Sequence, residues 1–407
     1  MISEKVVRET RTREPKAFQD RLEAELNDIR RAGSYREIRF VKPISATRIL
    51  YEGKECINLC SNSYLSLEVH PEVTAASESA VREYGSGTCS SRSVSGSIDL
   101  YRLLEEETAA FKGYPGALCF SNGYMANIGI ISTLTNEADV IFSDELNHSS
   151  IIHSTRLSRA RKVIYRHLDM EDLEKKIRAE ESGGTRFVIT ETVFSMDGDL
   201  APLADLAALK EKYGLCAIVD DAHGTGVFGQ RGRGVEESFE VTGKMDVHMS
   251  TFGKSLASFG AVVLGSPVII DYLVNRARTF LYTTALPASC LAASRAALAL
   301  LARDTSSKDR LWANIGYMRM RLQEMGFDLK ESVGPIVPLV VGDDEKAVTM
   351  QRMLLDRRIF LQAIRPPTVP PGTSRLRLTV VAGLSRDEMD QALEALAHAG
   401  KKVGLLG

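Results

Sequence analysis

The chain has 407 residues, of which 44% are hydrophobic and 26% charged, as is usual for a globular enzyme with a large apolar core. Its 51 basic and 53 acidic residues give a net charge of −2, so no overall field favours nucleic acid or anionic lipid. Six cysteines occur without a CxxC pair or His-rich spacing, which argues against a zinc site and a disulfide framework.

The first residues of the chain are charged throughout and lack the apolar stretch of a signal peptide. No run approaches 18 apolar residues, so we expect no membrane-spanning helix. Free cysteines in apolar or small-residue surroundings are typical of a reducing compartment. We therefore expect a cytoplasmic protein that binds no nucleic acid and holds no metal.

Residues 1–60 are predicted to form an N-terminal helix and a short β segment. The helix is predicted over residues 15–32, where apolar residues recur at helical spacing on a charged background. These positions are Phe18, Leu22, Leu26 and Ile29. We expect this helix to lie on a larger body. Residues 47–60 have the composition of short strands, with Gly53 in a hairpin-like turn.

Residues 61–286 are predicted to form a large domain in which strands and helices alternate. The strand candidates are apolar runs at residues 117–120, 139–143, 162–167, 187–193, 216–223, 247–252 and 261–266. Amphipathic helices, such as those expected at residues 169–182 and 202–214, separate several of them. Continuous apolar strands joined by helices predict an α/β fold with a mostly parallel sheet covered on both faces.

Residues 287–407 are predicted to form a smaller α+β domain. It begins with a helix rich in alanine and leucine at residues 287–302 and closes with a helix at 386–400. Strand candidates between them are residues 335–341 and 374–381.

Chemically useful side chains follow several of the predicted strands, where open parallel sheets bind their ligands. They are Glu191, Asp220, His223 and Lys254. Asp220 comes after four apolar residues, so its carboxylate is expected at the mouth of the sheet. A helix cap or a turn would explain such a carboxylate, and so would an anionic partner for a protonated ring nitrogen.

A phosphate site is one interpretation of residues 119–129, where a strand runs into Ser121, Asn122 and Gly123 before a helix expected from Tyr124. Exposed N–H groups at a helix N-terminus bind phosphate, although a plain strand–turn–helix connection has the same pattern. Neither GxGxxG nor GxxxxGK[ST] occurs, so the sequence supports neither a dinucleotide fingerprint nor a P-loop.

Lys254 lies among small residues in the stretch STFGKSLASFG. A lysine in a desolvated pocket has a lowered pKa and becomes a nucleophilic amine able to bond a carbonyl. Thr251 is suitably spaced to donate to a phosphate, and His148, either a helix cap or a ring that stacks on an aromatic ligand, follows a strand. Lysine, carboxylate, phosphate site and stacking ring together predict pyridoxal 5′-phosphate as cofactor.

Six motifs carry a family resemblance: NHSSII, TETVFSMDGD, VDDAHGTGVFGQRGRG, TFGKSLASFG, FLYTTALP and RPPTVPPGTSRLRLT. Over residues 35–400 the chain resembles the α-oxoamine synthases, which have the type I aminotransferase fold. The resemblance implies a homodimeric, pyridoxal phosphate-dependent acyltransferase. Such enzymes condense an amino acid with an acyl thioester of coenzyme A or an acyl carrier protein and release CO2.

The motifs leave the amino acid open between alanine, glycine and serine, and they leave the acyl chain and its carrier open. Two other readings share the fold. A pyridoxal phosphate-dependent aminotransferase would need no thioester, and a non-catalytic scaffold would have no use for Lys254.

The resemblance also implies a role for single residues around the cofactor. Lys254 would bond its carbonyl carbon, Asp220 would pair with the ring nitrogen, His223 with the phenolic oxygen, and His148 would stack on the ring. Further cofactor contacts are expected from Asn122, Gly123, Tyr124, Glu191, Ser195 and Thr251, and from Thr283 and Thr284 of a neighbouring subunit.

For the substrates, the resemblance implies that Asn62 and Arg377 bind the carboxylate of the amino acid, Arg377 through its bidentate fork. Thr368 would lie near the acyl chain, and Arg36 near the acyl or coenzyme A end. The sequence departs from the family pattern at Ser66, Tyr101, Asn122 and His153, where the family usually has glycine, histidine, serine and aspartate. These departures bear on the acyl substrate more than on the ring chemistry.

Overall fold

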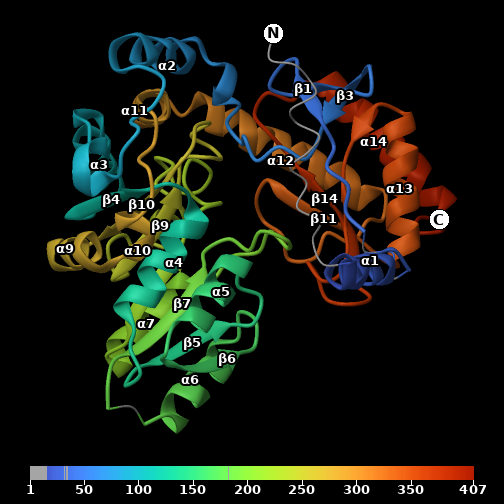
Figure 1. The fold of residues 1–407 in the computed structure, drawn as a ribbon. Coiled ribbons are helices and arrows are strands. Elements are labelled where there is room, and N and C mark those ends of the chain that lie inside the picture. Colours follow the sequence, from blue (N-terminus) through green and yellow to red (C-terminus); the bar gives the residue numbers. More distant parts are fainter. Residues whose placement is uncertain (1–15, 32, 34, 182) are drawn as a thin grey trace.

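A seven-stranded sheet forms the centre of the structure, a computed structural model that describes residues 16–31, 33, 35–181 and 183–407 (Figure 1). Its strands lie in the order β4, β10, β9, β8, β7, β5, β6. They span Gly116–Phe120 (β4), Val140–Asp144 (β5), Arg161–Tyr165 (β6), Arg186–Glu191 (β7), Cys216–Asp220 (β8), Val247–Thr251 (β9) and Ala261–Gly265 (β10). β10 is antiparallel to both neighbours and all other adjacent pairs are parallel. The predicted α/β fold with a mostly parallel sheet is confirmed.

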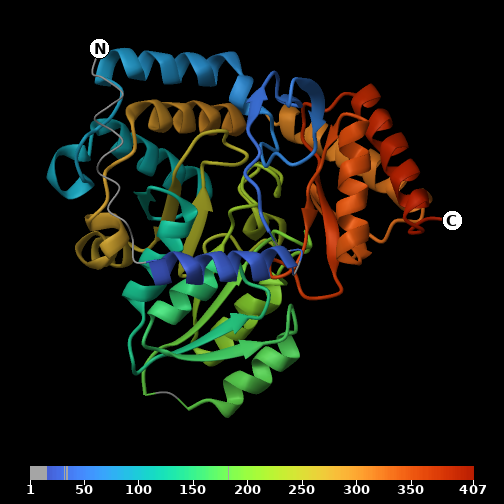
Figure 2. The same ribbon diagram turned by 45° about the vertical axis from the view of Figure 1, so that its right-hand side comes forward.

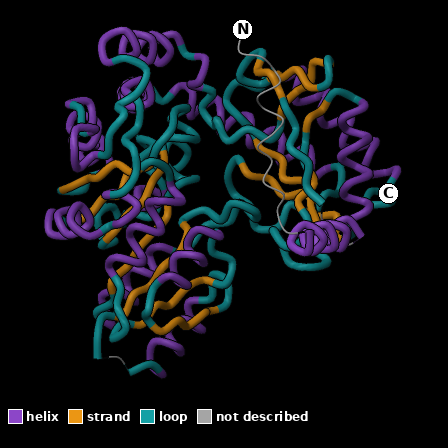
Figure 3. The backbone as a smooth tube through the Cα atoms, in the orientation of Figure 1, coloured by secondary structure: helices purple, strands orange, loops and turns teal. Residues whose placement is uncertain are grey.

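Apart from the edge strand β6, of which only Tyr165 is buried, the sheet is buried on both faces, which explains why its strands are continuous apolar runs. Successive residues of a strand point to opposite faces. Accordingly, Val188 and Val219 pack in one apolar cluster, while Ile189 and Ile218 pack in another. Helices lie on either side of the strands in Figure 3.

The helices of this body follow the predicted alternation. The helices predicted at residues 169–182 and 202–214 are α6 (Met170–Ala179) and α7 (Leu203–Tyr213). The others are α2 (Pro71–Tyr84), α3 (Asp99–Lys112), α4 (Gly123–Leu134), α5 (Ser149–Leu157), α8 (Val235–Ser238), α9 (Pro267–Arg276), α10 (Arg278–Leu281) and α11 (Ala288–Arg303), with short turns of helix at Leu67–Val69 and Arg92–Gly96.

The C-terminal part forms a separate layered body, to the right of the large sheet in Figure 1. Within the described chain, its antiparallel sheet has the order β11 (Ile336–Gly342), β14 (Ser374–Thr379), β13 (Ala363–Ile364). Helices α12 (Ser306–Glu324), α13 (Asp344–Asp356) and α14 (Arg386–Lys402) complete it. α14 begins with a capping box between Ser385 and Glu388.

The N-terminal strands pair with this C-terminal body. β1 (Val41–Pro43), β2 (Arg48–Tyr51) and β3 (Lys54–Asn58) are antiparallel, and β3 then pairs in parallel with β12 (Ile359–Phe360). The predicted turn at Gly53 joins β2 to β3, with φ of 48° at Glu52 and 73° at Gly53. The proposed boundaries at residues 60 and 286 stay a prediction.

Helix α1 (Lys16–Arg31) forms where the apolar spacing predicts it and is seen as a straight rod in Figure 2. The expected packing on a larger body is wrong for this structure, because none of its residues is buried. Its apolar side chains are 38–41% exposed. Residues 15 and 32, the predicted ends, lie outside the described residues. In the described part of the chain, no helix is long and apolar enough to cross a membrane.

Candidate active site

Parallel pairing brings the predicted polar residues to one edge of the large sheet. Glu191 and Asp220 are the last residues of β7 and β8 and lie opposite each other in the register. Thr251 ends the neighbouring strand β9, and the loops that follow β8 and β9 carry His223 and Lys254. The candidate site therefore lies at the carboxyl ends of three adjacent strands.

Lys254 points its amine at a histidine rather than at a carboxylate. Its Nζ lies 2.8 Å from Nε2 of His223. Burial lowers the pKa of Lys254 to about 8, although the charges of Asp220 and Glu191 act in the opposite direction. Burial, together with the Lys254 charge, also lowers the pKa of His223 well below its ordinary value. The pair thus consists of a readily deprotonated amine and a neutral imidazole.

A chain of hydrogen bonds continues from His223 to an arginine on the C-terminal body. The hydroxyl of Tyr64 lies 2.5 Å from Nδ1 of His223 and donates to Oδ1 of Asn62 at 3.3 Å. Arg377 donates through Nη1 to the same Asn62 oxygen at 3.2 Å. One tautomer of His223 satisfies every contact, with Nε2 accepting from Lys254 and Nδ1–H donating to Tyr64.

Tyr64 was not among the residues predicted from the sequence. It is 0% exposed, and burial raises its pKa to about 12, so it stays a hydroxyl at neutral pH. Its position two residues after Asn62 was the one feature of the sequence that pointed to a role in the site. A tyrosine beside Leu65 is equally typical of a buried core residue. Only the fold shows that its ring is buried while its hydroxyl reaches His223.

Arg377 lies on β14 and is held on one side by the protein. Its Nε donates to the backbone carbonyl of Ser195 at 2.5 Å, and Nη1 donates to Thr379 at 3.0 Å. Two residues earlier on β14, Arg375 donates to Asp197 at 2.6 Å, which fixes the segment after β7 against the C-terminal body. Ser195 therefore contributes a carbonyl to Arg377.

The carboxylate of Asp220 is oriented from two sides. Oδ2 accepts from Nδ2 of Asn127, on α4, at 2.8 Å, and Oδ1 accepts from the backbone N–H of Ala222 at 2.9 Å. The contact with Ala222 closes a turn, which is one of the two roles that the sequence allowed for Asp220. The residue forms this turn and its carboxylate also faces the site. Asn127 was also absent from the sequence prediction.

The next residue, Asp221, belongs to the core. It is 0% exposed and accepts from Lys112 at 3.0 Å, Thr192 at 2.7 Å and Thr225 at 2.8 Å. These partners hold the pKa of Asp221 below its ordinary value despite its burial. Of the two adjacent aspartates, only Asp220 is directed at the site.

His148 is the N-cap of α5, so the cap reading of this residue is realised. Its Nδ1 accepts from the N–H of Ser150 at 3.2 Å and lies 2.7 Å from the Ser150 hydroxyl, which also accepts from Asn127. Although His148 is exposed at the mouth of the site, the protein around its ring lowers its pKa. A cap leaves the ring face and Nε2 free of the helix backbone.

Burial and the neighbouring Asp220 charge raise the pKa of Glu191 well above its ordinary value. The two carboxyl groups lie opposite each other at the same edge of the sheet.

The proposed phosphate end is the first turn of α4. Asn122 caps the helix by accepting from the N–H of Met125 at 2.9 Å. The N–H groups of Gly123 and Tyr124 lie in the first turn of the helix, where no helical carbonyl lies four residues earlier to accept their hydrogen bonds. They are therefore available to an anion. Thr251 donates to the carbonyl of Gly260 at 2.9 Å, and its contact with a phosphate stays a prediction.

Two predicted contacts from the neighbouring subunit lie in the segment after α10. Thr283 lines a small cavity that Ser121 and Arg92 also line, and Thr284 is exposed. Tyr101 fixes this segment, because its hydroxyl accepts from the N–H of Leu286 at 2.6 Å. The reach of Thr283 and Thr284 into another subunit stays a prediction.

The other departures from the family pattern also have structural partners. His153 lies 2.8 Å from the Tyr124 hydroxyl through Nδ1. Ser66 adopts a φ of 57° and accepts from the N–H of Gly383 at 3.0 Å. Asn122 is the helix cap, and Tyr101 holds the segment that carries Thr283. None of the four hydrogen bonds to Lys254, Asp220 or His223 within the described chain.

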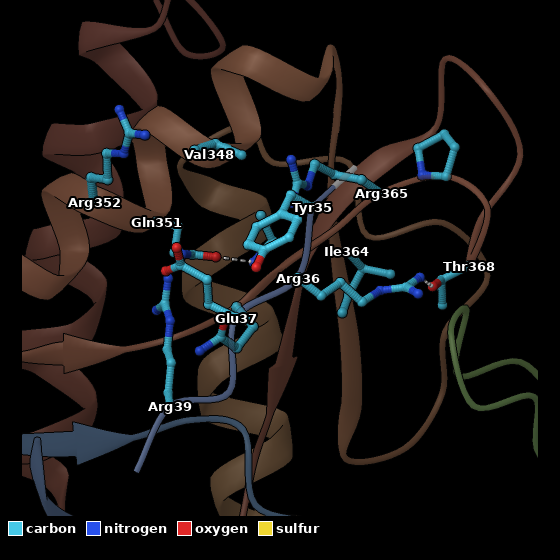
Figure 4. Close-up of a pocket in the computed structure, with 13 residues that line it drawn as sticks. Tyr35, Arg36, Glu37, Arg39, Val348, Gln351, Arg352, Ile364, Arg365 and Thr368 are labelled. Carbon is cyan, nitrogen blue, oxygen red and sulfur yellow. Dashed lines mark hydrogen bonds between the residues drawn. The ribbon is translucent and has the colours of Figure 1, made fainter. Parts of the chain in front are cut away.

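Arg36 and Thr368 are placed apart from this cluster, in a separate cavity of about 500 Å³ between residues 35–39, α13 and residues 362–368 (Figure 4). They lie together there, with Nη2 of Arg36 donating to Oγ1 of Thr368 at 3.2 Å. Neither is hydrogen-bonded to the network around Lys254.

Known proteins resemble the chain over most of its length. The sequence profile of the aminotransferase class I and II family matches residues 54–396. Two curated relatives, the 8-amino-7-oxononanoate synthases of Geobacter sulfurreducens and Geotalea daltonii, are each 47% identical, covering 94% of this chain and 98% of theirs.

Solved structures resemble it as well. A serine palmitoyltransferase from S. paucimobilis with a bound PLP–myriocin aldimine is 32% identical and gives a TM-score of 0.90, covering 97% of this chain and all of its own. An 8-amino-7-oxononanoate synthase from Francisella tularensis is 30% identical with a TM-score of 0.74, covering 85% of this chain and 98% of its own.

Proposed function

Because the chain belongs to the aminotransferase class I and II family, we propose that it is a pyridoxal 5′-phosphate-dependent acyltransferase with the activity of an 8-amino-7-oxononanoate synthase. In this reaction L-alanine and a pimeloyl thioester condense, and the products are an α-amino ketone, CO2 and the free thiol. The reaction belongs to biotin biosynthesis.

The chemistry of the donor set fits the cofactor. Lys254 supplies an amine with a pKa of about 8, suited to bonding a carbonyl carbon. Asp220 supplies an oriented carboxylate for a protonated ring nitrogen, and the first turn of α4 supplies N–H donors for a phosphate. When bound, pyridoxal phosphate supplies an electron sink for the electrons released at the α-carbon.

The residues of the chain then handle the protons. Lys254, once exchanged for the incoming amino group, is the base that takes the α-proton of the substrate and later returns one to the product. A pKa near 8 suits both directions at neutral pH. His223 accepts from the amine and keeps Nζ directed into the site. His148, with Nε2 free of the helix cap, is placed to donate to the oxygen that develops charge on the thioester carbonyl.

Arg377 and Asn62 are proposed to orient the amino acid. The guanidinium is held by Ser195, Thr379 and Asn62, which leaves Nη2 for the substrate carboxylate. The position of the carboxylate decides which bond of the α-carbon is aligned with the electron-accepting ring of the cofactor. It therefore decides whether a proton or CO2 leaves first.

The choice of alanine and a pimeloyl thioester rests on the sequence identity to curated 8-amino-7-oxononanoate synthases. Six of these relatives are 42–47% identical over more than nine-tenths of the chain. A second candidate, condensation of L-serine with a long-chain thioester, is favoured by the TM-score of 0.90 to serine palmitoyltransferase. Glycine with an acetyl thioester is a third pairing within the same chemistry.

A matrix of amino acids and thioesters tests the proposal. L-Alanine, glycine and L-serine are each combined with acetyl, pimeloyl and palmitoyl thioesters, and release of free thiol and of CO2 is followed. We expect the pair of alanine and pimeloyl thioester to turn over fastest. If serine and palmitoyl thioester turned over fastest, the second candidate would replace the proposed activity. Amino-group transfer to a keto acid without thiol release would make the chain an aminotransferase.

We also propose a homodimer, supported by the row of exposed apolar side chains on α1 and by Thr284 on an exposed segment beside the phosphate end. Light scattering on the purified protein tests the mass directly. The cytoplasmic location stays a prediction.

A further inference from the structure

A cavity of about 510 Å³ lies between α3, α11 and residues 231–233 of the loop that follows β8. Its volume is within the range of roughly 300–1,000 Å³ for sites that bind small molecules. The cavity shares no described lining residue with the hydrogen-bonded network around Lys254 or with the cavity that contains Arg36. Its apolar lining comes from the two helices and includes Ala110, Phe111, Ala299 and Ala302.

Two arginines at the end of the motif VDDAHGTGVFGQRGRG line the same cavity without a polar partner. The side chains of Arg231 and Arg233 form no ion pair and donate no hydrogen bond to any residue that the structure describes. Nε of Arg233 is moreover buried. The guanidinium carbon of Arg233 lies 6.0 Å from the centroid of the Phe111 ring. Buried polar groups are normally hydrogen-bonded, so an unpaired guanidinium beside a cavity indicates a place for an anion.

Glu107 is the one carboxylate among the described lining residues, and it is already paired. Arg295, on α11, donates to its two oxygens at 2.9 and 2.5 Å. This bidentate contact joins α3 to α11 and neutralises the carboxylate. The guanidiniums of Arg231 and Arg233 are therefore the uncompensated charges of the lining.

The loop that carries the two arginines is held against both helices. Lys112, at the end of α3, donates to the backbone carbonyl of Arg233. Gly232 packs on α11 so closely that a Cβ at this position would lie 2.9 Å from Cδ1 of Leu301. The backbone between the arginines is thus fixed before a ligand arrives, which lowers the entropy cost of binding.

From these observations we propose that the cavity between α3 and α11 binds a monocarboxylic acid with an apolar chain. The carboxylate bonds to Arg231 and Arg233, and the chain lies along Phe111 and the alanines of the two helices. A dicarboxylate would bring its second charge to the apolar lining, and an amphiphilic amine would meet the two guanidiniums with a like charge. The site goes beyond the proposed function and does not depend on it.

Titration of octanoate into the holoenzyme tests the proposal by calorimetry. We expect saturable binding that weakens about tenfold in Arg233→Gln, which removes a charge-assisted contact. The loss in Arg231→Gln should be smaller, about threefold, because Arg231 is exposed. Octylamine, which has the same chain and the opposite charge, should not bind. Butanoate should bind at least tenfold more weakly than octanoate, because four methylene groups no longer contact the apolar lining.

The matched control is Arg357→Gln, which removes an exposed arginine at the C-terminal end of α13 that does not line the cavity. Its affinity for octanoate should match that of the unmodified protein. Equal affinity in Arg233→Gln and Arg357→Gln would overturn the proposal. No binding of octanoate to the unmodified protein, or equal binding of octylamine, would do the same.

A second variant leaves both arginines in place, since Arg233 is partly buried and its replacement also affects the loop. Ala299 is exposed on α11, so Ala299→Glu should fold normally and place a charge in the apolar lining. Octanoate binding should fall at least tenfold. Ala75→Glu, at an exposed position of α2 that does not line the cavity, should leave binding unchanged. Equal affinity in these two variants would place octanoate elsewhere and overturn the proposal.

Discussion

The hydroxyl of Tyr64 lies 2.5 Å from Nδ1 of His223, on the side of the ring opposite the amine of Lys254. Tyr64 also contacts Asn62, which Arg377 reaches. The proposed proton-transfer lysine and the proposed substrate clamp are thus joined by hydrogen bonds through one buried tyrosine. We therefore expect a carboxylate that binds at Arg377 to influence Lys254 through this chain.

Replacement of that hydroxyl should separate the two groups. Tyr64→Phe keeps the buried ring and removes the link, leaving His223 with an unpaired nitrogen. We expect kcat/KM for the amino acid to fall about tenfold, with a shift in the pH profile of turnover, since His223 no longer has its tautomer fixed. Steady-state kinetics across pH measure both effects.

Tyr84→Phe is the matched control, because that hydroxyl donates to Asp99 at the start of α3, away from the site. It should leave the pH profile unchanged. A Tyr64→Phe enzyme with the same profile as Tyr84→Phe would show that the hydrogen-bonded chain has no part in turnover.

The pKa of Lys254 predicts how cofactor uptake depends on pH. The folded value of about 8 is below the ordinary 10.5, so the neutral amine predominates above pH 8 and is lost as pH falls through that value. At pH 8 about half of the amine is neutral, compared with roughly 0.3% for an ordinary lysine. We expect the rate at which cofactor-free protein bonds pyridoxal phosphate to rise about tenfold per pH unit below 8 and to level off above it.

The rate is followed by visible absorbance in stopped-flow mixing, with Lys254→Ala as the blank that shows neither this absorbance nor turnover. A rate that keeps rising up to pH 10 would mean that the amine is not desolvated. Turnover in Lys254→Ala would remove the proposed chemistry altogether.

Some residues of the site could be predicted from the sequence and others could not. Asp220, His223 and Lys254 could be placed at one sheet edge because buried strands appear in the sequence as continuous apolar runs and parallel strands share their carboxyl ends. Asn127 and Tyr64 could not, since Asn127 lies within α4 and Tyr64 lies in a turn beside Leu65, and each gains its partner only by tertiary packing.

The same limit applies to larger elements. The apolar spacing of α1 predicts a helix but not what covers it, and the expected packing was wrong. Helices α12 and α13 were missed, because a mixed charged and apolar composition gave them no distinct signal. Arg36 and Thr368 were expected at the acyl substrate, yet nothing in the sequence shows that they share a cavity with Arg352.

The adjacent aspartates should respond differently to the same substitution. Asp220→Asn removes the carboxylate proposed for the ring nitrogen, so we expect cofactor affinity and turnover to fall by about a hundredfold with stability nearly unchanged. Asp221→Asn leaves the buried Lys112 without its counterion, at a cost of about 3–5 kcal/mol in the free energy of unfolding. Denaturant unfolding and cofactor titration are measured on both variants. Equal behaviour of the two would contradict the division between site and core.

Arg377 should be intolerant of lysine although the charge is kept. A lysine cannot make the contacts of Nε with Ser195 and of Nη1 with Asn62 and Thr379 while also presenting a fixed donor to substrate. In Arg377→Lys we expect the KM for the amino acid to rise about tenfold or more, with little change in the KM for the acyl thioester. Arg375→Lys is the comparison, because Arg375 is buried against Asp197 and its loss should lower the thermal midpoint first. If the amino acid KM of Arg377→Lys stayed at the unmodified value while the thioester KM rose, the guanidinium would have to be reassigned to the acyl donor.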